Sequence, residues 1–143
     1  MMHNFGINIT LAIILLGGIF TACSKDTGML AIYEINGTVT DSVTNTPLNR
    51  IRIIRKGTDY LLFNDTTFTD VNGKYSFLLT DYYSKNASFS LKIEDTDGLL
   101  NGGEYKPHNV ELKFSANDWA FSGVPKEYEG MATTTTDIKL QKK

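Results

Sequence analysis

Apolar and polar residues alternate with a period of two along most of this chain. The clearest run is Phe89, Leu91 and Ile93, which are separated by Ser90 and Lys92. Successive side chains of a β-strand point to opposite faces, so this pattern predicts strands with one buried and one exposed face. Comparable runs bring the expected strands to about seven: 35–39, 51–55, 75–79, 89–93, 110–114, 133–140, and either 60–63 or 66–69. No window of a dozen residues repeats with the 3.6-residue period of a helix, so we predict an all-β, antiparallel β-sandwich.

The same alternation predicts which side chains lie inside and which turns connect the strands. The expected core includes Phe77, Phe89, Leu91, Ile93, Leu112 and Phe114, while Lys92, Glu94, Glu111 and Lys113 should face solvent. The Asn72-Gly73 pair favours a tight turn with positive φ angles. We expect the turn at 70–73 to close a β-hairpin between 66–69 and 74–77.

The N-terminal segment has a different character from the rest of the chain. Residues 11–20 form an uninterrupted apolar run of ten, which is about half the length that a membrane-spanning helix needs and suits the core of a secretory signal. Cys23 follows directly after Thr21 and Ala22, and this junction resembles the lipobox of bacterial lipoproteins. We predict that Cys23 is lipidated and that the lipid is the link to the membrane.

Three segments follow from this interpretation: a signal peptide over 1–22, a lipid-anchored tether over 23–31 and the sandwich domain over 32–143. The expected location is the bacterial cell envelope, at the outer membrane and facing either the periplasm or the surface.

Composition and charge exclude several classes of function. A formal net charge of −2 gives no basic surface for nucleic acid. The single Cys excludes an intrachain disulfide and a Cys-based zinc cage. After removal of the signal, His108 is the only histidine, and no nucleophile–base pair or phosphate-binding loop is visible. We therefore expect neither an enzyme nor a transition-metal cofactor.

Several motifs resemble the carboxypeptidase regulatory-like family. The matching stretches are 36–41 (NGTVTD), 46–48 (TPL), 51–53 (IRI) and 67–77 (TFTDVNGKYSF). The resemblance implies a seven-stranded, transthyretin-like (prealbumin-like) sandwich without a catalytic site. The lipobox and the stretch 93–105 are also similar to lipoproteins of Bacteroidota that are named for neighbouring radical-SAM genes.

One acidic loop has the composition of a cation site. Asp95, Asp97, Asn101 and Glu104 place three carboxylates and an amide within ten residues, and calcium prefers six to eight such oxygen ligands. The alternative, which we favour, is a polar loop whose Asp and Asn side chains bond to their own backbone. No cofactor is expected unless this loop holds calcium.

Aromatic residues provide a second candidate site. Trp119, Tyr82 and Tyr83 could form a platform for glycans or peptides, although packing in the core or at the end of the sandwich is the simpler explanation. These observations favour a non-enzymatic, lipid-anchored envelope protein that acts as a binding or structural module with a protein or glycan partner. The alternatives are an exported substrate or partner of a radical-SAM-linked maturation system, and an accessory subunit that binds glycan or peptide.

Overall fold

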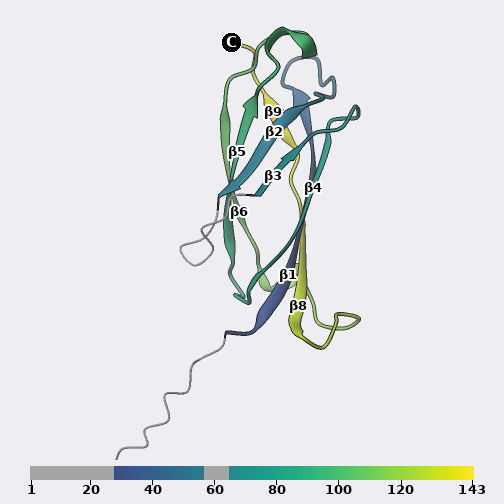
Figure 1. Cartoon of the computed structure of the whole chain (residues 1–143), viewed down its shortest axis with the longest axis vertical. Helices are drawn as coiled ribbons and strands as arrows, with labels where there is room; N and C mark the ends of the chain where they lie inside the picture. The colour runs from purple at the N-terminus through teal and green to yellow at the C-terminus, as the bar shows by residue number, and fades with distance from the viewer. Residues whose placement is uncertain (1–27, 57–64) are drawn as a thin grey trace, which may run out of the picture.

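Two β-sheets face each other across one apolar core in the computed structural model, which describes residues 28–56 and 65–143 (Figure 1). The strands are β1 (Leu30–Asp41), β2 (Ile51–Lys56), β3 (Asp65–Phe68), β4 (Lys74–Tyr82), β5 (Ser88–Asp95), β6 (His108–Lys113), β7 (Trp119–Ala120), β8 (Tyr128–Thr135) and β9 (Ile138–Leu140). Two short 3₁₀ turns, η1 (Gly98–Asn101) and η2 (Ala116–Asp118), complete the described elements. The predicted all-β sandwich is confirmed.

The long strand β1 organises the first sheet. Its neighbours follow the order β4-β1-β8-β7, and β9 continues along β1 beyond the end of β8. The second sheet has the order β3-β2-β5-β6. Both β8 and β9 run parallel to β1, so the first sheet is mixed and not wholly antiparallel. Alternation alone could not reveal this, because a strand presents the same two faces to a parallel or an antiparallel neighbour.

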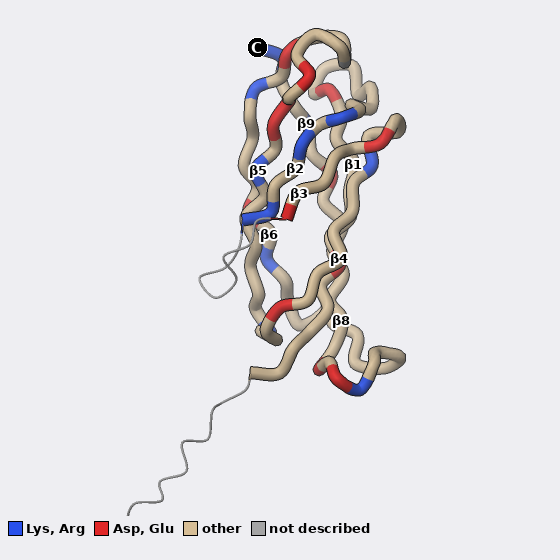
Figure 2. The backbone as a smooth tube through the Cα atoms, viewed as in Figure 1, with Lys and Arg blue, Asp and Glu red and all other residues tan. Residues whose placement is uncertain are grey.

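The core contains the residues that the alternation selected. All six predicted core residues are buried, together with Tyr33, Ile35, Ile51 and Ile53. Glu111 and Lys113 are exposed as predicted, whereas Lys92 and Glu94 are half-buried on the outer face of β5. Glu94 pairs there with both Lys92 and Arg52. Figure 2 shows acidic and basic residues interspersed over the two sheets.

The turn at 70–73 forms, but it does not close a hairpin. Gly73 has φ +72°, and its N–H donates to the Asp70 carbonyl at 2.9 Å. The prediction about the flanking strands is wrong, since β3 pairs with β2 and β4 pairs with β1 in the described part of the chain. The N–H of Val39 donates to the Gly73 carbonyl at 2.8 Å. This contact docks the turn on β1, so the chain crosses from one sheet to the other.

A close backbone approach occurs where the chain passes from β8 to β9. The Thr136 N–H donates to the Asn36 carbonyl at 2.8 Å, and the Thr136 carbonyl accepts from the Tyr75 hydroxyl at 2.8 Å. A Cβ atom on Gly37 would lie 1.9 Å from the Thr136 oxygen. Only glycine therefore allows β8 and β9 to follow β1 in succession.

We expect Gly37→Ala to lower the free energy of unfolding by about 3 kcal/mol, because the added methyl group must displace backbone atoms. Asn36→Ala is the matched control: this neighbouring side chain is on the outer face of β1, and its loss should change stability by less than about 0.5 kcal/mol. Urea denaturation followed by circular dichroism measures both values. Equal losses in the two variants would show that the approach at Gly37 imposes no constraint.

Candidate functional site

A buried carboxylate lies at the end of β4. This strand alternates regularly, with Tyr75, Phe77 and Leu79 facing inward, and Asp81 is next in the same phase. Asp81 is only 5% exposed. Its Oδ1 accepts from the N–H of Tyr82 at 2.7 Å, while its Oδ2 has no hydrogen-bond partner among the described residues. An unpaired buried oxygen typically costs about 1–3 kcal/mol, so this atom is a candidate for ligand recognition.

Asp81 lines a pocket of about 340 Å³ with an aromatic floor. Tyr33 and Phe89 line its inner side and are almost fully buried, with ring centroids 5.1 Å apart in an edge-to-face arrangement. Tyr82 lines the pocket as well, and its polar lining comes from Ser84, Asn86 and Ser88. Such a volume lies within the range of small-molecule sites, about 300–1,000 Å³.

Tyr33 is held in place as a neutral phenol. Its hydroxyl donates to the Tyr82 carbonyl at 2.8 Å and accepts from the N–H of Ser84 at 3.2 Å. Burial raises the pKa of Tyr33, and the negative charge of Asp81 adds to the effect. The pocket thus combines a charged hydrogen-bond acceptor with a rigid aromatic surface, which suits a flat ligand that carries a hydroxyl or another donor.

The three predicted aromatic residues gather at this end of the sandwich. Trp119 is buried, with its ring 5.3 Å from that of Tyr33 and 4.7 Å from that of Tyr83. Trp119 and Tyr83 therefore pack with the core and form no exposed platform. Tyr82 is 48% exposed and borders the pocket.

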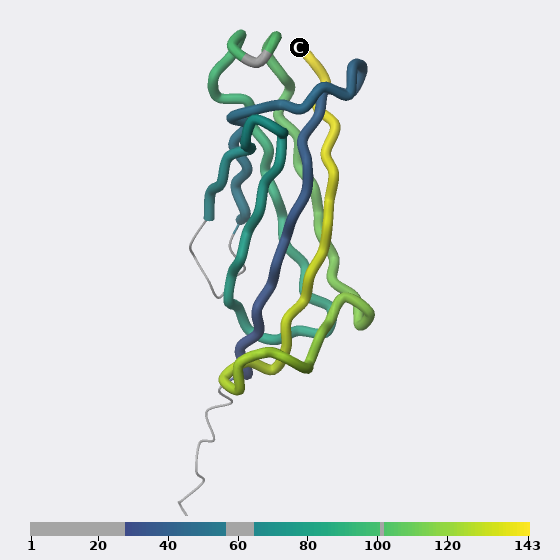
Figure 3. The backbone as a smooth tube through the Cα atoms, turned by 90° about the vertical axis from the view of Figure 1, so that its right-hand side faces the viewer, coloured from purple at the N-terminus to yellow at the C-terminus, as the bar shows by residue number. Residues whose placement is uncertain are grey.

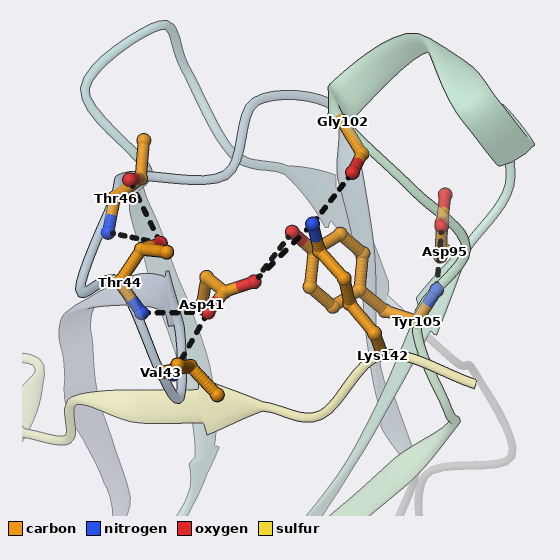
Figure 4. Close-up of polar contacts among 8 residues, drawn as sticks. All are labelled: Asp41, Val43, Thr44, Thr46, Asp95, Gly102, Tyr105 and Lys142. Atoms are coloured by element: carbon orange, nitrogen blue, oxygen red, sulfur yellow. Dashed lines mark hydrogen bonds and ion pairs between the residues drawn. The ribbon is translucent and has the colours of Figure 1, made fainter.

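The predicted calcium loop contains η1 and is at the opposite end of the sandwich, near the C-terminus (Figure 1). Figure 4 shows Asp95 of this loop bonded to Tyr105. Asp95 accepts from the backbone N–H groups of Asp97 at 3.2 Å and Tyr105 at 3.0 Å. Glu104 pairs with Lys143 at 3.0 Å. Burial raises the pKa of Asp97, and hydrogen bonding to Asp95 raises it further. No side chain is described for Asn101, and no three His, Cys, Asp or Glu of the described residues gather as a metal site.

Asp41 and Tyr105 anchor this end of the fold. The Tyr105 hydroxyl donates to Asp41 Oδ2 at 2.9 Å, and Asp41 Oδ1 accepts from the N–H groups of Val43 at 2.8 Å and Thr44 at 2.9 Å. The backbone N–H bonds of Thr44 and Val43 lower the pKa of Asp41 to about 2. Burial, and then the hydrogen bond to Asp41, raise the pKa of Tyr105 to about 12.

Sequence reasoning missed two buried charges. Arg55 is 3% exposed and points inward, in phase with Ile51 and Ile53. Its guanidinium donates to Asp65 Oδ2 and lies 5.5 Å from the centroid of the Phe89 ring. The sequence contains a signal that could have predicted the burial of Arg55 and Asp81. Each is a charged residue at a position in phase with the buried face of its strand.

The solved structures with a similar arrangement of strands include catechol 1,2-dioxygenases. The chlorocatechol 1,2-dioxygenase of Pseudomonas putida gives a TM-score of 0.54 at 17% identity, over 81% of this chain and 62% of that one. The catechol 1,2-dioxygenase of Acinetobacter radioresistens gives 0.52 at 15% identity, over 86% of this chain and 55% of that one. At this identity the likeness to the intradiol dioxygenases is one of fold alone. The chain spans a little over half the length of these neighbours, and no family model and no curated protein sequence matches it.

These comparisons correct several expectations. The resemblance to carboxypeptidase regulatory-like lipoproteins is wrong, because the structural neighbours are intradiol dioxygenases. Its motifs consist of turn formers and core positions, which many sandwiches share. The expectation of a non-enzymatic binding or structural module is wrong as well, since the neighbours that share this fold are enzymes. The radical-SAM-linked and accessory-subunit alternatives are withdrawn with it.

The cofactor expectation, none or calcium, is corrected too, because catechol dioxygenases use non-haem iron. The described residues do not themselves fit an iron ion. Such iron is commonly held by several imidazole and carboxylate ligands, yet His108 stands exposed at the start of β6 and no suitable group of described residues gathers. The buried phenols of Tyr33, Tyr75 and Tyr105 each donate to a protein oxygen. Burial raises the pKa of each, which keeps them protonated at neutral pH.

Acid should weaken the fold through Asp41. Its pKa is about 2 in the folded chain and 3.8 ordinarily, so its contribution to stability is present in full above the ordinary value and is lost as pH falls toward 2. We expect Asp41→Asn to be less stable than the wild type at pH 7 and to lose less stability between about pH 4 and pH 2. Denaturation at a series of pH values measures this difference.

Glu111→Gln is the control for this experiment, because Glu111 is exposed on β6. Its stability should follow the wild-type curve throughout. Glu94, Asp118 and Asp137 also have a lowered pKa and leave a residual slope in every variant. If Asp41→Asn keeps the full wild-type slope, the hydrogen bonds at Asp41 do not control the acid response.

Proposed function

We propose that this chain takes a small aromatic diol as its substrate, in the pocket at Asp81, and that a lipid on Cys23 holds it at the bacterial envelope. The observation that carries the first part is the unpaired Oδ2 of Asp81 beside an aromatic floor. An ionised carboxylate is a strong acceptor for a phenolic hydroxyl, and a flat ring fits against Phe89 and Tyr82.

The fold supports the choice of ligand class. The neighbours are named for catechol and chlorocatechol, which are aromatic rings with two adjacent hydroxyl groups. A diol of this kind could donate one hydroxyl to Asp81 while its second hydroxyl reaches the polar side chains of Ser84, Asn86 and Ser88. In this arrangement Asp81 orients the ring and holds the hydroxyl proton at Oδ2.

The lipid anchor rests on the N-terminal sequence. Cys23 lies after the apolar run 11–20, and both fall outside the described residues. In the described ranges, no helix has the length and hydrophobicity that a membrane span requires. The strand β1 begins at Leu30, seven positions after Cys23, so a lipid there would hold the sandwich close to the membrane surface.

Catechol titrated into the protein should change the fluorescence of Trp119, the single tryptophan of the chain, because its ring contacts Tyr33 in the pocket wall. We expect Asp81→Asn to bind catechol about 10–100-fold more weakly, which corresponds to the loss of a hydrogen bond to a charged group, about 1.5–3 kcal/mol. Glu111→Gln should bind like the wild type.

The dimethyl ether of catechol has no hydroxyl group that can donate a hydrogen bond, so it should bind weakly to every variant. Wild-type binding of the ether as tight as that of catechol would contradict the proposed role of Asp81, as would equal catechol affinity of Asp81→Asn and the wild type.

Cys23→Ser should abolish acylation and release the protein from the membrane fraction while the fold remains intact. Intact-mass analysis of the membrane-bound wild type should find a chain that begins at Cys23 and carries the mass of the lipid. A wild-type chain without that mass would overturn the anchor and leave the catechol proposal standing.

A further inference from the structure

Exposed apolar side chains gather at the end of the sandwich where β1 begins. Met29 is 61% exposed, Leu30 42%, Tyr82 48% and Phe121 59%. These four residues, which we call the tether-end patch, come from the start of β1, the end of β4 and the loop after β7. Single exposed apolar residues are common on protein surfaces, but several that adjoin one another mark a contact surface.

Contacts between the segments join the patch into one surface. The N–H of Tyr83 donates to the Met29 carbonyl at 2.7 Å, which ties the end of β4 to the start of β1. Trp119 packs against Tyr83 at 4.7 Å on one side and stacks on Phe121 at 6.2 Å on the other. Figures 1 and 3 show the start of β1 and the β7–β8 loop at the same end of the sandwich, opposite the C-terminus.

We propose that the tether-end patch docks on the surface of the lipid bilayer. This inference rests on the proposed lipid at Cys23. Gly28, where the described structure starts, lies five positions after Cys23, and a chain of that length reaches at most about 18 Å. A lipid on Cys23 therefore brings this end of the sandwich, and no other, within reach of the membrane.

The chemistry of the patch matches that of a bilayer surface. Tyrosine and other aromatic side chains favour the boundary between headgroups and acyl chains, and lysines flank them there. Lys85 and Lys126 are exposed in the loops that border the patch. The far end also exposes apolar residues, among them Val43, Val71 and Leu99, but these are aliphatic and occupy the tips of turns.

The fluorescence of Trp119 also tests this contact. The acylated full-length protein is reconstituted into vesicles whose phospholipids carry bromine on the upper acyl chain, which quenches a nearby tryptophan. We expect quenching in the wild type and its loss for the most part in the double variant Met29→Ser/Phe121→Ser. Leu99→Ser, at the far end, is the matched control and should be quenched like the wild type. A thermal melt of each variant confirms that it is folded.

The outcomes separate this proposal from the lipid anchor. A wild-type protein without the lipid mass would overturn the anchor and, with it, the docking. A wild-type protein that carries the lipid but shows no quenching would overturn the docking alone, and so would a double variant that is quenched as strongly as the wild type. If a cross-linker placed at residue 121 captured a protein in cells while the vesicles gave no quenching, the patch would be a protein interface.

Discussion

The close approach of the Thr136 backbone to Gly37 is the constraint on which the first sheet depends. One strand, β1, has to accept β4 along one edge and β8 followed by β9 along the other. The change from β8 to β9 is possible only where the crossing chain touches β1, and it is held there by the bonds of Thr136 to Asn36 and Tyr75. Because β9 then reaches the end of β1 near Asp41, the same constraint positions the C-terminal residues.

Three charged side chains are buried in the described part of the chain, namely Asp41, Arg55 and Asp81, and the last two face the core between the sheets. Arg55 has an opposite charge beside it, since it pairs with Asp65 and lies over the ring of Phe89, although its Nη1 has no hydrogen-bond partner among the described residues. Asp81 accepts one backbone N–H at Oδ1, and no cation pairs with it among the described residues. Burying a charged group is unfavourable unless it is fully paired. An incompletely paired buried carboxylate is therefore a typical feature of a ligand-binding site. This asymmetry is the physical reason for placing the functional site at Asp81 and not at Arg55.

The two ends of the sandwich differ in structure and in the roles we propose for them. The end with Asp41 and Tyr105 is closed by hydrogen bonds that fasten the 42–46 turn and the loop that enters β6. The end with Tyr33 and Asp81 contains the pocket and the exposed aromatic residues. Tyr82 belongs to both the pocket and the tether-end patch, so the pocket borders that surface.

The strands and the faces that they bury follow from the sequence alone, because a side-chain period of two is a local property and burial of apolar groups is the dominant driving force. Phe89, Leu91 and Ile93 could be placed inside the fold for that reason. The sequence also determined the tight turn at Gly73, whose positive φ needs a residue without a side chain.

The pairing of the strands and the burial of the charges became visible only in the folded chain. The turn at Gly73 leads to β1 and not back to β3, because its carbonyl bonds to Val39, which is far away in the sequence. The sequence of the acidic loop is compatible with a cation site or with a set of turns. In the structure Asp95 and Glu104 bond to protein groups, which favours the turns. The motifs at 36–41 and 67–77 describe turns and core positions that unrelated sandwiches share, so they could not distinguish one sandwich family from another. Strand order, the mixed sheet and the unpaired oxygen of Asp81 depend on contacts between distant residues, and local patterning does not encode such contacts.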